Sequence, residues 1–158
     1  MNITGATLVE GRASGDVFAL AEPLSFWGGF DAKTGLVIDR RHPDCGACLT
    51  GRIVVVEAAR GSSSGSSVLA EAIRAGTAPA AFILSTRDAI LTVGAQVALE
   101  LYGTACPIVV VSPDDLQRAR TAHRIELYAK SEPPICTLSP FFKGERAGRG
   151  AATGAERD

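Results

Sequence analysis

The N-terminal part of the chain alternates apolar and polar side chains over short stretches, which is typical of strands with one face exposed. This alternation predicts strands at residues 6–10 and 16–20, and the glycine-bounded residues 11–15 predict a turn that joins them. A third strand is predicted at residues 36–38. Neighbouring strands joined by so short a turn favour an antiparallel arrangement in this part of the chain.

An aromatic segment, residues 23–31, separates these predicted strands. It contains Phe26, Trp27 and the paired glycines Gly28 and Gly29, which allow backbone conformations closed to other residues. Such a segment either faces a functional site or packs over the edge of the core. The sequence favours neither interpretation.

The pattern changes at Gly51, where strictly apolar runs alternate with helical periodicity. A continuous run of β-branched residues indicates a strand buried on both faces. The predicted elements of this region are a strand at 53–56, a Gly/Ser-rich loop at 58–67, a helix ending at Gly76, a strand at 80–84, a helix from 90 to 101 and a strand at 108–111. This order implies a locally parallel sheet with right-handed crossovers.

The two patterns together predict an α/β fold, a β/β/α domain with a mixed sheet, over residues 1–140. A short helix at 114–119 and a final strand at 124–129 complete it. Residues 141–158 are expected to form a disordered tail, because from Lys143 onward the chain has no aromatic residue and is dominated by small and charged ones.

Size and charge narrow the classes of function. A chain of 158 residues with 46% apolar residues fits one domain with a single core. A formal net charge of -1 and a pI near 6.1 provide no basic field, so neither nucleic acid nor a membrane surface is an expected partner. With no long apolar run and no signal-like N-terminus, the protein is expected to be cytoplasmic.

Four cysteines are present, and two of them form a C-x-x-C motif at Cys45 and Cys48. This spacing describes a redox pair or half of a zinc site, but Cys106 and Cys136 are not paired at the usual spacing for the other half. Two ordinary residues in a turn are the favoured explanation of the motif. In the cytosol the thiols are expected to be reduced.

The Ser-rich loop carries the strongest chemical signal, because it joins a buried strand to a helix. Backbone N–H groups at a helix start attract a carboxylate, a phosphate or an oxyanion, and the serine hydroxyls add donors. A helix cap by Ser64 or Ser66, or a flexible linker, are the structural alternatives. The loop lacks the Gly-Lys-Ser/Thr of a P-loop, and neither His42 nor His123 belongs to a G-x-S-x-G elbow, so nucleotide triphosphate binding and serine hydrolysis rank low.

Several motifs in a fixed order resemble the small subunit of the aconitase X family over residues 1–135. They are Pro23-Leu24-Ser25-Phe26-Trp27-Gly28-Gly29, Asp31, Thr34-Gly35, His42-Pro43, Gly46, Gly51-Arg52-Ile53-Val54-Val55, Arg60-Gly61-Ser62-Ser63-Ser64 and Gly76-Thr77-Ala78-Pro79-Ala80-Ala81. The resemblance implies a swivelling β/β/α domain. It also implies a large partner subunit that holds an iron-sulfur cluster through its own cysteines, so that this chain is active only with that subunit.

The activity implied by the resemblance is dehydration of a β-hydroxy acid by a hydro-lyase. A base removes the proton α to the carboxylate while iron assists departure of the hydroxyl. The family's substrates are cis-3-hydroxy-L-proline in bacteria and mevalonate 5-phosphate in archaea. A composition rich in Ala, Gly and Arg and poor in Lys favours the bacterial substrate.

Roles for individual residues also follow from the resemblance. Ser62 matches the family's proton acceptor, and Arg60, Gly61, Ser63, Ser64 and His42 match positions expected to bind substrate. A free serine hydroxyl is a weak base, so the loop must stabilise an alkoxide. True aconitases have an arginine where this chain has Ser64. No metal ligand is expected in this chain.

Two hypotheses of other classes stand beside the enzyme subunit. A stand-alone module could hold a small anion in the Ser-rich loop without any reaction. A C-x-x-C redox or zinc protein is the other, and metal analysis of the isolated chain would separate it from the rest.

Overall fold

Seven strands close into a barrel in the computed structural model, which describes residues 2–144. Around the barrel the order is β1 (Ile3–Val9), β7 (Ile108–Val110), β6 (Ala81–Leu84), β5 (Ile53–Val55), β2 (Gly11–Ala19), β8 (Arg124–Ala129) and β9 (Ile135–Phe141). A separate two-stranded sheet contains β3 (Phe30–Asp31) and β4 (Leu36–Val37). The helices are α1 (Phe26–Gly29), α2 (Gly65–Ala75), α3 (Ala89–Tyr102) and α4 (Pro113–Thr121).

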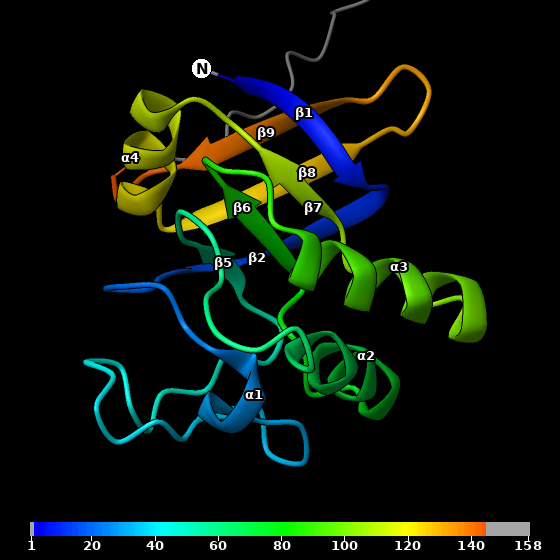
Figure 1. Ribbon diagram of the computed structural model, residues 1–158. Coiled ribbons are helices and arrows are strands. Elements are labelled where there is room, and N and C mark those ends of the chain that lie inside the picture. Colours follow the sequence, from blue (N-terminus) through cyan, green and yellow to red (C-terminus); the bar gives the residue numbers. More distant parts are fainter. Residues whose placement is uncertain (1, 145–158) are drawn as a thin grey trace, which may run out of the picture.

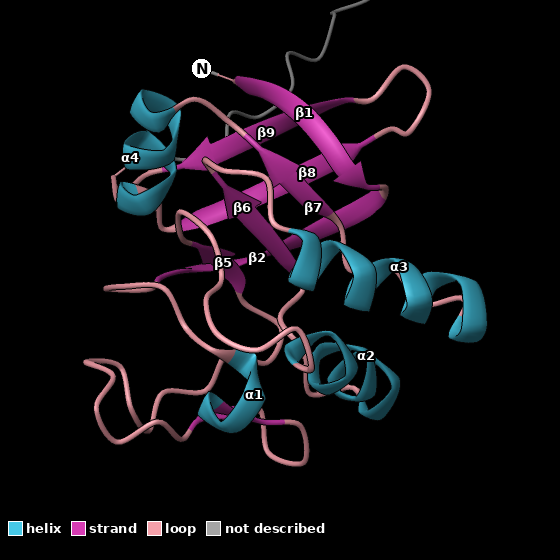
Figure 2. Cartoon of the chain, viewed as in Figure 1, coloured by secondary structure: helices cyan, strands magenta, loops and turns pink. Residues whose placement is uncertain are grey.

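The barrel sheet is mixed, as the sequence predicted. β2, β5, β6 and β7 run parallel to their neighbours in that series, whereas β8, β9 and β1 complete the ring through antiparallel pairs. The crossover helices α2 and α3 lie together on one side of the sheet, and α4 lies on another (Figures 1 and 2). The predicted α/β class and the alternating order of strands and helices after Gly51 are therefore confirmed.

The core explains why the central strands are continuously apolar. Val54 points into the cluster under α2 and α3, together with Leu69, Phe82 and Leu91. Its neighbours Ile53 and Val55 belong to the second cluster, which Leu116 of α4 and Leu138 of β9 complete. β5 is thus buried on both faces, and this removes the alternation that marks a half-exposed strand.

The predicted N-terminal hairpin is wrong. β2 begins at Gly11 and runs through the residues expected to form the turn, and it pairs with β5 and β8 rather than with β1. The glycines serve the strand itself. A Cβ at Gly15 would lie 2.6 Å from the Gly51 carbonyl oxygen, so the glycine permits a close approach of two backbones rather than a reversal of the chain.

One strand was missed at the C-terminal end. In β9 the buried residues alternate at Cys136, Leu138 and Pro140. The flanking and internal prolines hide this pattern, because proline normally argues against a strand. Phe142 packs against the core, so the ordered fold extends two residues beyond the predicted boundary at 140, while the predicted tail from residue 145 onward lies outside the described residues.

Within residues 2–144, none of the helices has both the length and the apolar character that a membrane span requires.

Candidate active site in the serine-rich loop before helix α2

The Ser-rich loop follows the carboxyl end of β5 and leads directly into α2 (Figure 1). In open parallel sheets, ligands bind beyond the carboxyl ends of the strands, where loops converge. Residues 60–64 are exposed, whereas Gly65, the first residue of α2, is buried. The loop therefore presents its side chains to solvent while the helix behind it is anchored.

Asp88 anchors the base of the loop. Its buried carboxylate accepts a hydrogen bond from the Ala59 backbone N–H (2.8 Å) and another from the Leu91 backbone N–H (2.9 Å). The second bond caps α3. One carboxylate thereby ties the start of the loop to the start of a neighbouring helix.

A second tie joins α2 to α3. The Ser66 hydroxyl donates to the Ile90 carbonyl oxygen over 2.9 Å. Gly94 allows the close helix contact, because a Cβ there would lie 2.6 Å from the Ser66 carbonyl oxygen. Ser66 is therefore committed to structure.

The aromatic segment 23–31 lies beside the Ser-rich loop and also packs against the core. Phe26 is buried against the core, while Trp27 is 57% exposed. Ser25 pairs with Arg60 in an isolated bridge, and Gly61, at a φ of 88°, leaves room for the Ser25 side chain where a Cβ would collide with it. Gly61 is thus required by both its backbone conformation and this close approach.

Of Ser62, Ser63 and Ser64, only Ser62 uses its hydroxyl in a hydrogen bond within the described residues. Ser64 occupies the N-cap position of α2, but its side chain makes no capping hydrogen bond. Ser62 Oγ accepts a hydrogen bond from the Ser64 backbone N–H over 3.2 Å. Within the described residues the side chains of Ser63 and Ser64 have no hydrogen-bond partner, so they remain available to a ligand.

The N–H groups that are free for a ligand lie in the loop before α2, not in the first turn of the helix itself. The N–H groups of Gly65, Ser66 and Ser67 already donate to the carbonyl oxygens three residues before them, at 3.0, 3.1 and 3.2 Å. In the described part of the chain, the N–H groups of Gly61, Ser62 and Ser63 have no hydrogen-bond acceptor. Those of Ser62 and Ser63 are the nearer two to the positive end of the α2 dipole, where an anion is favoured.

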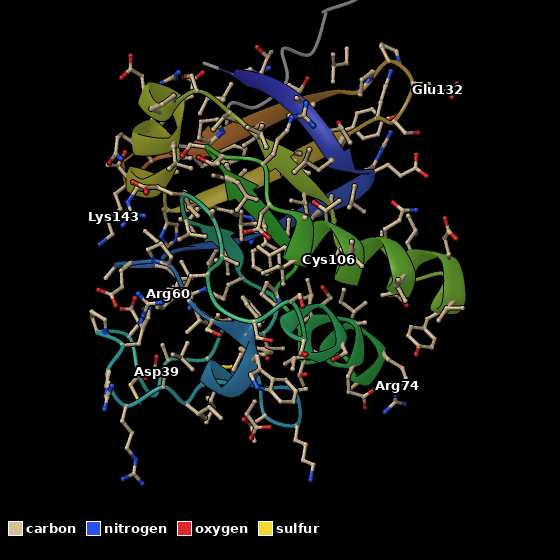
Figure 3. All side chains as sticks on the ribbon, viewed as in Figure 1. Asp39, Arg60, Arg74, Cys106, Glu132 and Lys143 are labelled. Carbon is tan, nitrogen blue, oxygen red and sulfur yellow. The ribbon has the colours of Figure 1, made fainter. Side chains whose placement is uncertain are left out.

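Arg60 supplies the cation of the site, and Glu22 is its partner. The guanidinium Nη2 lies 3.2 Å from Glu22 Oε1, and the two side chains are 46% and 41% exposed. Figure 3 shows Arg60 on the same side of the molecule as Asp39, away from Glu132 in the turn between β8 and β9. Nothing in the local sequence marked Glu22, because its partner lies 38 residues further along the chain.

His42 was expected to touch substrate, but the structure gives it a supporting position. Its side chain is fully buried, with Nε2 2.9 Å from the Glu22 carbonyl oxygen and Nδ1 accepting from the Asp44 backbone N–H at 3.0 Å. These partners require the proton on Nε2. With both nitrogens engaged, His42 offers no free base and instead holds the backbone of Glu22.

The cysteines form two classes. Cys45 and Cys48 are exposed free thiols, and hydrogen bonding to Thr50 lowers the pKa of Cys48. Burial raises the pKa of Cys106 to about 12 and that of Cys136 to about 11. Across residues 2–144 there is no cluster of three or more His, Cys, Asp or Glu side chains that could hold a metal ion, so the zinc hypothesis has no support there.

Comparison with known proteins gives consistent results. A family model described as aconitase X swivel domain matches residues 2–133. The chain is 45% identical over 139 residues to cis-3-hydroxy-L-proline dehydratase of Pseudomonas aeruginosa, which covers 84% of this chain but only 24% of that protein. It is 31% identical over 129 residues to the phosphomevalonate dehydratase small subunit of Thermococcus gammatolerans, covering 82% of this chain and 92% of the relative.

A solved structure shares the fold. The crystal structure of Thermococcus kodakaraensis aconitase X in its holo-form superposes with a TM-score of 0.70 at 25% identity, and the match covers 88% of this chain and 98% of that one. The matches therefore cover nearly the whole length of the Thermococcus gammatolerans small subunit and of the solved aconitase X chain. The chain spans only about a quarter of the Pseudomonas dehydratase.

Proposed function

The chain belongs to the aconitase X swivel-domain family, and from that premise we propose that it is the small subunit of a cytoplasmic, heteromeric iron-sulfur hydro-lyase that dehydrates cis-3-hydroxy-L-proline. The observation that carries the proposal is the Ser-rich loop, which is held rigidly from behind yet leaves the hydroxyls of Ser62, Ser63 and Ser64 exposed. The 45% identity to a named cis-3-hydroxy-L-proline dehydratase supports the choice of substrate.

Ser62 is the proposed proton acceptor. The hydrogen bond from the Ser64 N–H to Ser62 Oγ stabilises the alkoxide more than the neutral hydroxyl, because a donor favours the charged form of its acceptor. The α2 dipole and the neighbouring cation Arg60 act in the same direction. The alkoxide takes the α-proton of the substrate and becomes the neutral hydroxyl.

The substrate carboxylate is proposed to lie against the rest of the loop. The free N–H groups of Ser62 and Ser63, the hydroxyls of Ser63 and Ser64, and Arg60 provide donors for it. Gly61 keeps this stretch close to Ser25, and His42 supports it indirectly through the backbone of Glu22. An exposed loop of donors is completed only when another surface covers it and excludes water.

That surface is proposed to be the large subunit, which also holds the iron-sulfur cluster. The donor set of the described residues does not fit such a cluster, since it contains no group of three candidate ligands. Departure of the β-hydroxyl is accordingly assigned to groups of the large subunit. This chain contributes the base and the carboxylate site.

A specific observation favours mevalonate 5-phosphate as a second candidate substrate. The chain is 31% identical over 129 residues to the phosphomevalonate dehydratase small subunit of Thermococcus gammatolerans, against 45% over 139 residues to the cis-3-hydroxy-L-proline dehydratase of Pseudomonas aeruginosa. Sequence identity therefore favours the first substrate, and the similarity to the small subunit keeps the second as the alternative. A non-catalytic anion-binding module is the remaining alternative.

Co-expression with the large subunit tests the proposal. The purified small chain alone should be colourless and inactive, and the assembled pair should dehydrate cis-3-hydroxy-L-proline but not mevalonate 5-phosphate. If the assembled pair dehydrates mevalonate 5-phosphate and not cis-3-hydroxy-L-proline, mevalonate 5-phosphate is the substrate. Full activity of the small chain without added protein would refute the two-subunit proposal.

A further inference from the structure

The ion pair between Arg60 and Glu22 occupies the place where the proposed substrate carboxylate must bind. The guanidinium therefore already has a carboxylate partner, 3.2 Å away. Both side chains remain nearly half exposed, and exposed ion pairs contribute little to stability. Exchanging Glu22 for another carboxylate costs little at this position.

The backbones under this pair are held in place. The Glu22 carbonyl oxygen lies 2.9 Å from Nε2 of the buried His42, and the Arg60 N–H donates to the Leu24 carbonyl oxygen at 3.3 Å. An isolated parallel β-bridge also pairs the backbone of Ser25 with that of Arg60. The two charged groups thus project from fixed backbone positions, and only their side chains need to move when a ligand enters.

We infer that Arg60 and Glu22 together form a receptor for an amino acid zwitterion, with Glu22 as the specificity residue. This inference rests on the proposed function. Cis-3-hydroxy-L-proline carries a carboxylate and a ring ammonium on the same carbon atom. Arg60 releases Glu22 to bind the substrate carboxylate, and Glu22 then accepts hydrogen bonds from the ring ammonium.

Charge balance makes this exchange selective. One ion pair becomes two, and no charge is left without a partner after the site is covered. An acid with anionic groups only would take Arg60 and leave Glu22 unpaired beside a further negative charge. An unpaired, desolvated carboxylate is strongly unfavourable, so Glu22 disfavours mevalonate 5-phosphate.

The test compares two ligands that cannot be dehydrated, L-proline and cyclopentanecarboxylate, which differ mainly in the ring ammonium. Their dissociation constants are measured by calorimetry on the assembled two-subunit enzyme, as wild type and as Glu22→Gln. The preference for L-proline over cyclopentanecarboxylate should fall by about tenfold or more in the variant, the value of a charge-assisted hydrogen bond. Cyclopentanecarboxylate itself should bind equally well or more tightly, because Arg60 is no longer occupied.

A matched control removes a glutamate charge from an exposed arginine elsewhere. Glu71→Gln breaks the pair of Glu71 with Arg74 on α2 and should leave both dissociation constants unchanged. With cis-3-hydroxy-L-proline as substrate, Glu22→Gln should raise KM about tenfold or more and leave kcat within a few-fold.

Three outcomes would overturn the inference. The first is an unchanged ligand preference in Glu22→Gln. The second is a wild-type enzyme that binds neither ligand or does not prefer L-proline. The third is a collapse of kcat in Glu22→Gln with unchanged affinity for L-proline, which would give Glu22 a role in the chemical step. A wild-type enzyme that prefers L-proline but does not dehydrate hydroxyproline would refute the proposed function alone.

Discussion

The two halves of the barrel differ in how far their exposed polar groups are engaged with other groups of the chain. The antiparallel half, β2, β8 and β9, carries a hollow of about 660 Å³ on its outer face. Two of the polar side chains in that hollow are already engaged: Arg12 stacks over the Tyr128 ring at 4.2 Å, and Ser14 Oγ accepts a hydrogen bond from Arg124. The parallel half ends instead in the Ser-rich loop, where residues 60–64 are exposed and, within the described residues, the hydroxyls of Ser63 and Ser64 have no hydrogen-bond partner.

The hollow on the antiparallel half and the proposed site on the parallel half are therefore different places on the molecule. The loop residues 60–64 do not line the 660 Å³ hollow. In the antiparallel half, a short turn at residues 130–134 joins β8 to β9, and the Ser139 hydroxyl donates a hydrogen bond to Asn2 Oδ1. In the parallel half, each crossover begins with a loop at a strand end, and such a loop can hold donors out of the sheet.

The largest expected effect is the loss of the proposed base, Ser62. Ser62→Ala in the assembled enzyme should lower kcat about a hundredfold or more, the contribution of positioned proton transfer, with little change in KM. Ser139→Ala is the matched control in the antiparallel half, where the hydroxyl binds Asn2 at 3.2 Å, and it should leave kcat unchanged. Steady-state kinetics on both variants checks this.

Solvent deuterium exchange at the substrate α-carbon isolates the proton transfer. If Ser62→Ala still exchanges that proton at the wild-type rate, another residue is the base. His42 would not be the first choice, since both of its ring nitrogens are engaged.

The next effect concerns the rigidity behind the loop. Asp88→Ala should lower the free energy of unfolding by about 2 to 3 kcal/mol, because a buried carboxylate that accepts two backbone hydrogen bonds is removed. Asp16→Ala in the antiparallel half breaks only an exposed pair with Arg124 and should cost less than about 0.5 kcal/mol. Urea unfolding measures both, and equal losses would contradict the anchoring role of Asp88.

A smaller effect separates binding from catalysis within the loop. Ser63→Ala and Ser64→Ala should each raise KM about two- to tenfold, the value of one hydrogen bond, and leave kcat nearly unchanged. Steady-state kinetics with cis-3-hydroxy-L-proline tests this. A fall in kcat as large as that of Ser62→Ala would show that the assignment of Ser62 as the only base is wrong.

The smallest effect leaves the fold and the activity unchanged and concerns the thiols. The native chain is treated with iodoacetamide at about pH 7.5 to 8, just below the pKa of a free thiol. Cys45 and Cys48 should be modified, and Cys106 and Cys136 should not. The lowered pKa of Cys48 gives it more thiolate at this pH than an ordinary thiol has, whereas the raised pKa values of about 12 and 11 keep Cys106 and Cys136 protonated. Mass spectrometry before and after denaturation counts the labels, and native labelling of Cys106 would contradict the buried core.

The parallel half was predictable because its signals are local. Continuous apolar runs bounded by glycine, proline or serine defined β5, β6 and β7, and helical spacing defined α2 and α3. Asp88, directly before α3, also carried a readable signal, since aspartate is a preferred N-cap. The sequence could not show that the second carboxylate oxygen of Asp88 accepts a hydrogen bond from Ala59, because the two residues are 29 positions apart.

By itself, the sequence determined the α/β class, the strand–loop–helix around the serines and the family resemblance, since each depends on residue spacing within one segment. Only the tertiary structure decided that β2 runs through the predicted turn, that Glu22 meets Arg60 and that His42 lies beneath them. The physical reason is that glycine spacing fits either a turn or a close backbone approach, and a charged side chain does not encode its distant partner. The parallel pairing of β2 with β5 places the segments that follow these two strands side by side, and the pairing of β2 with β8 extends the strand through the predicted turn.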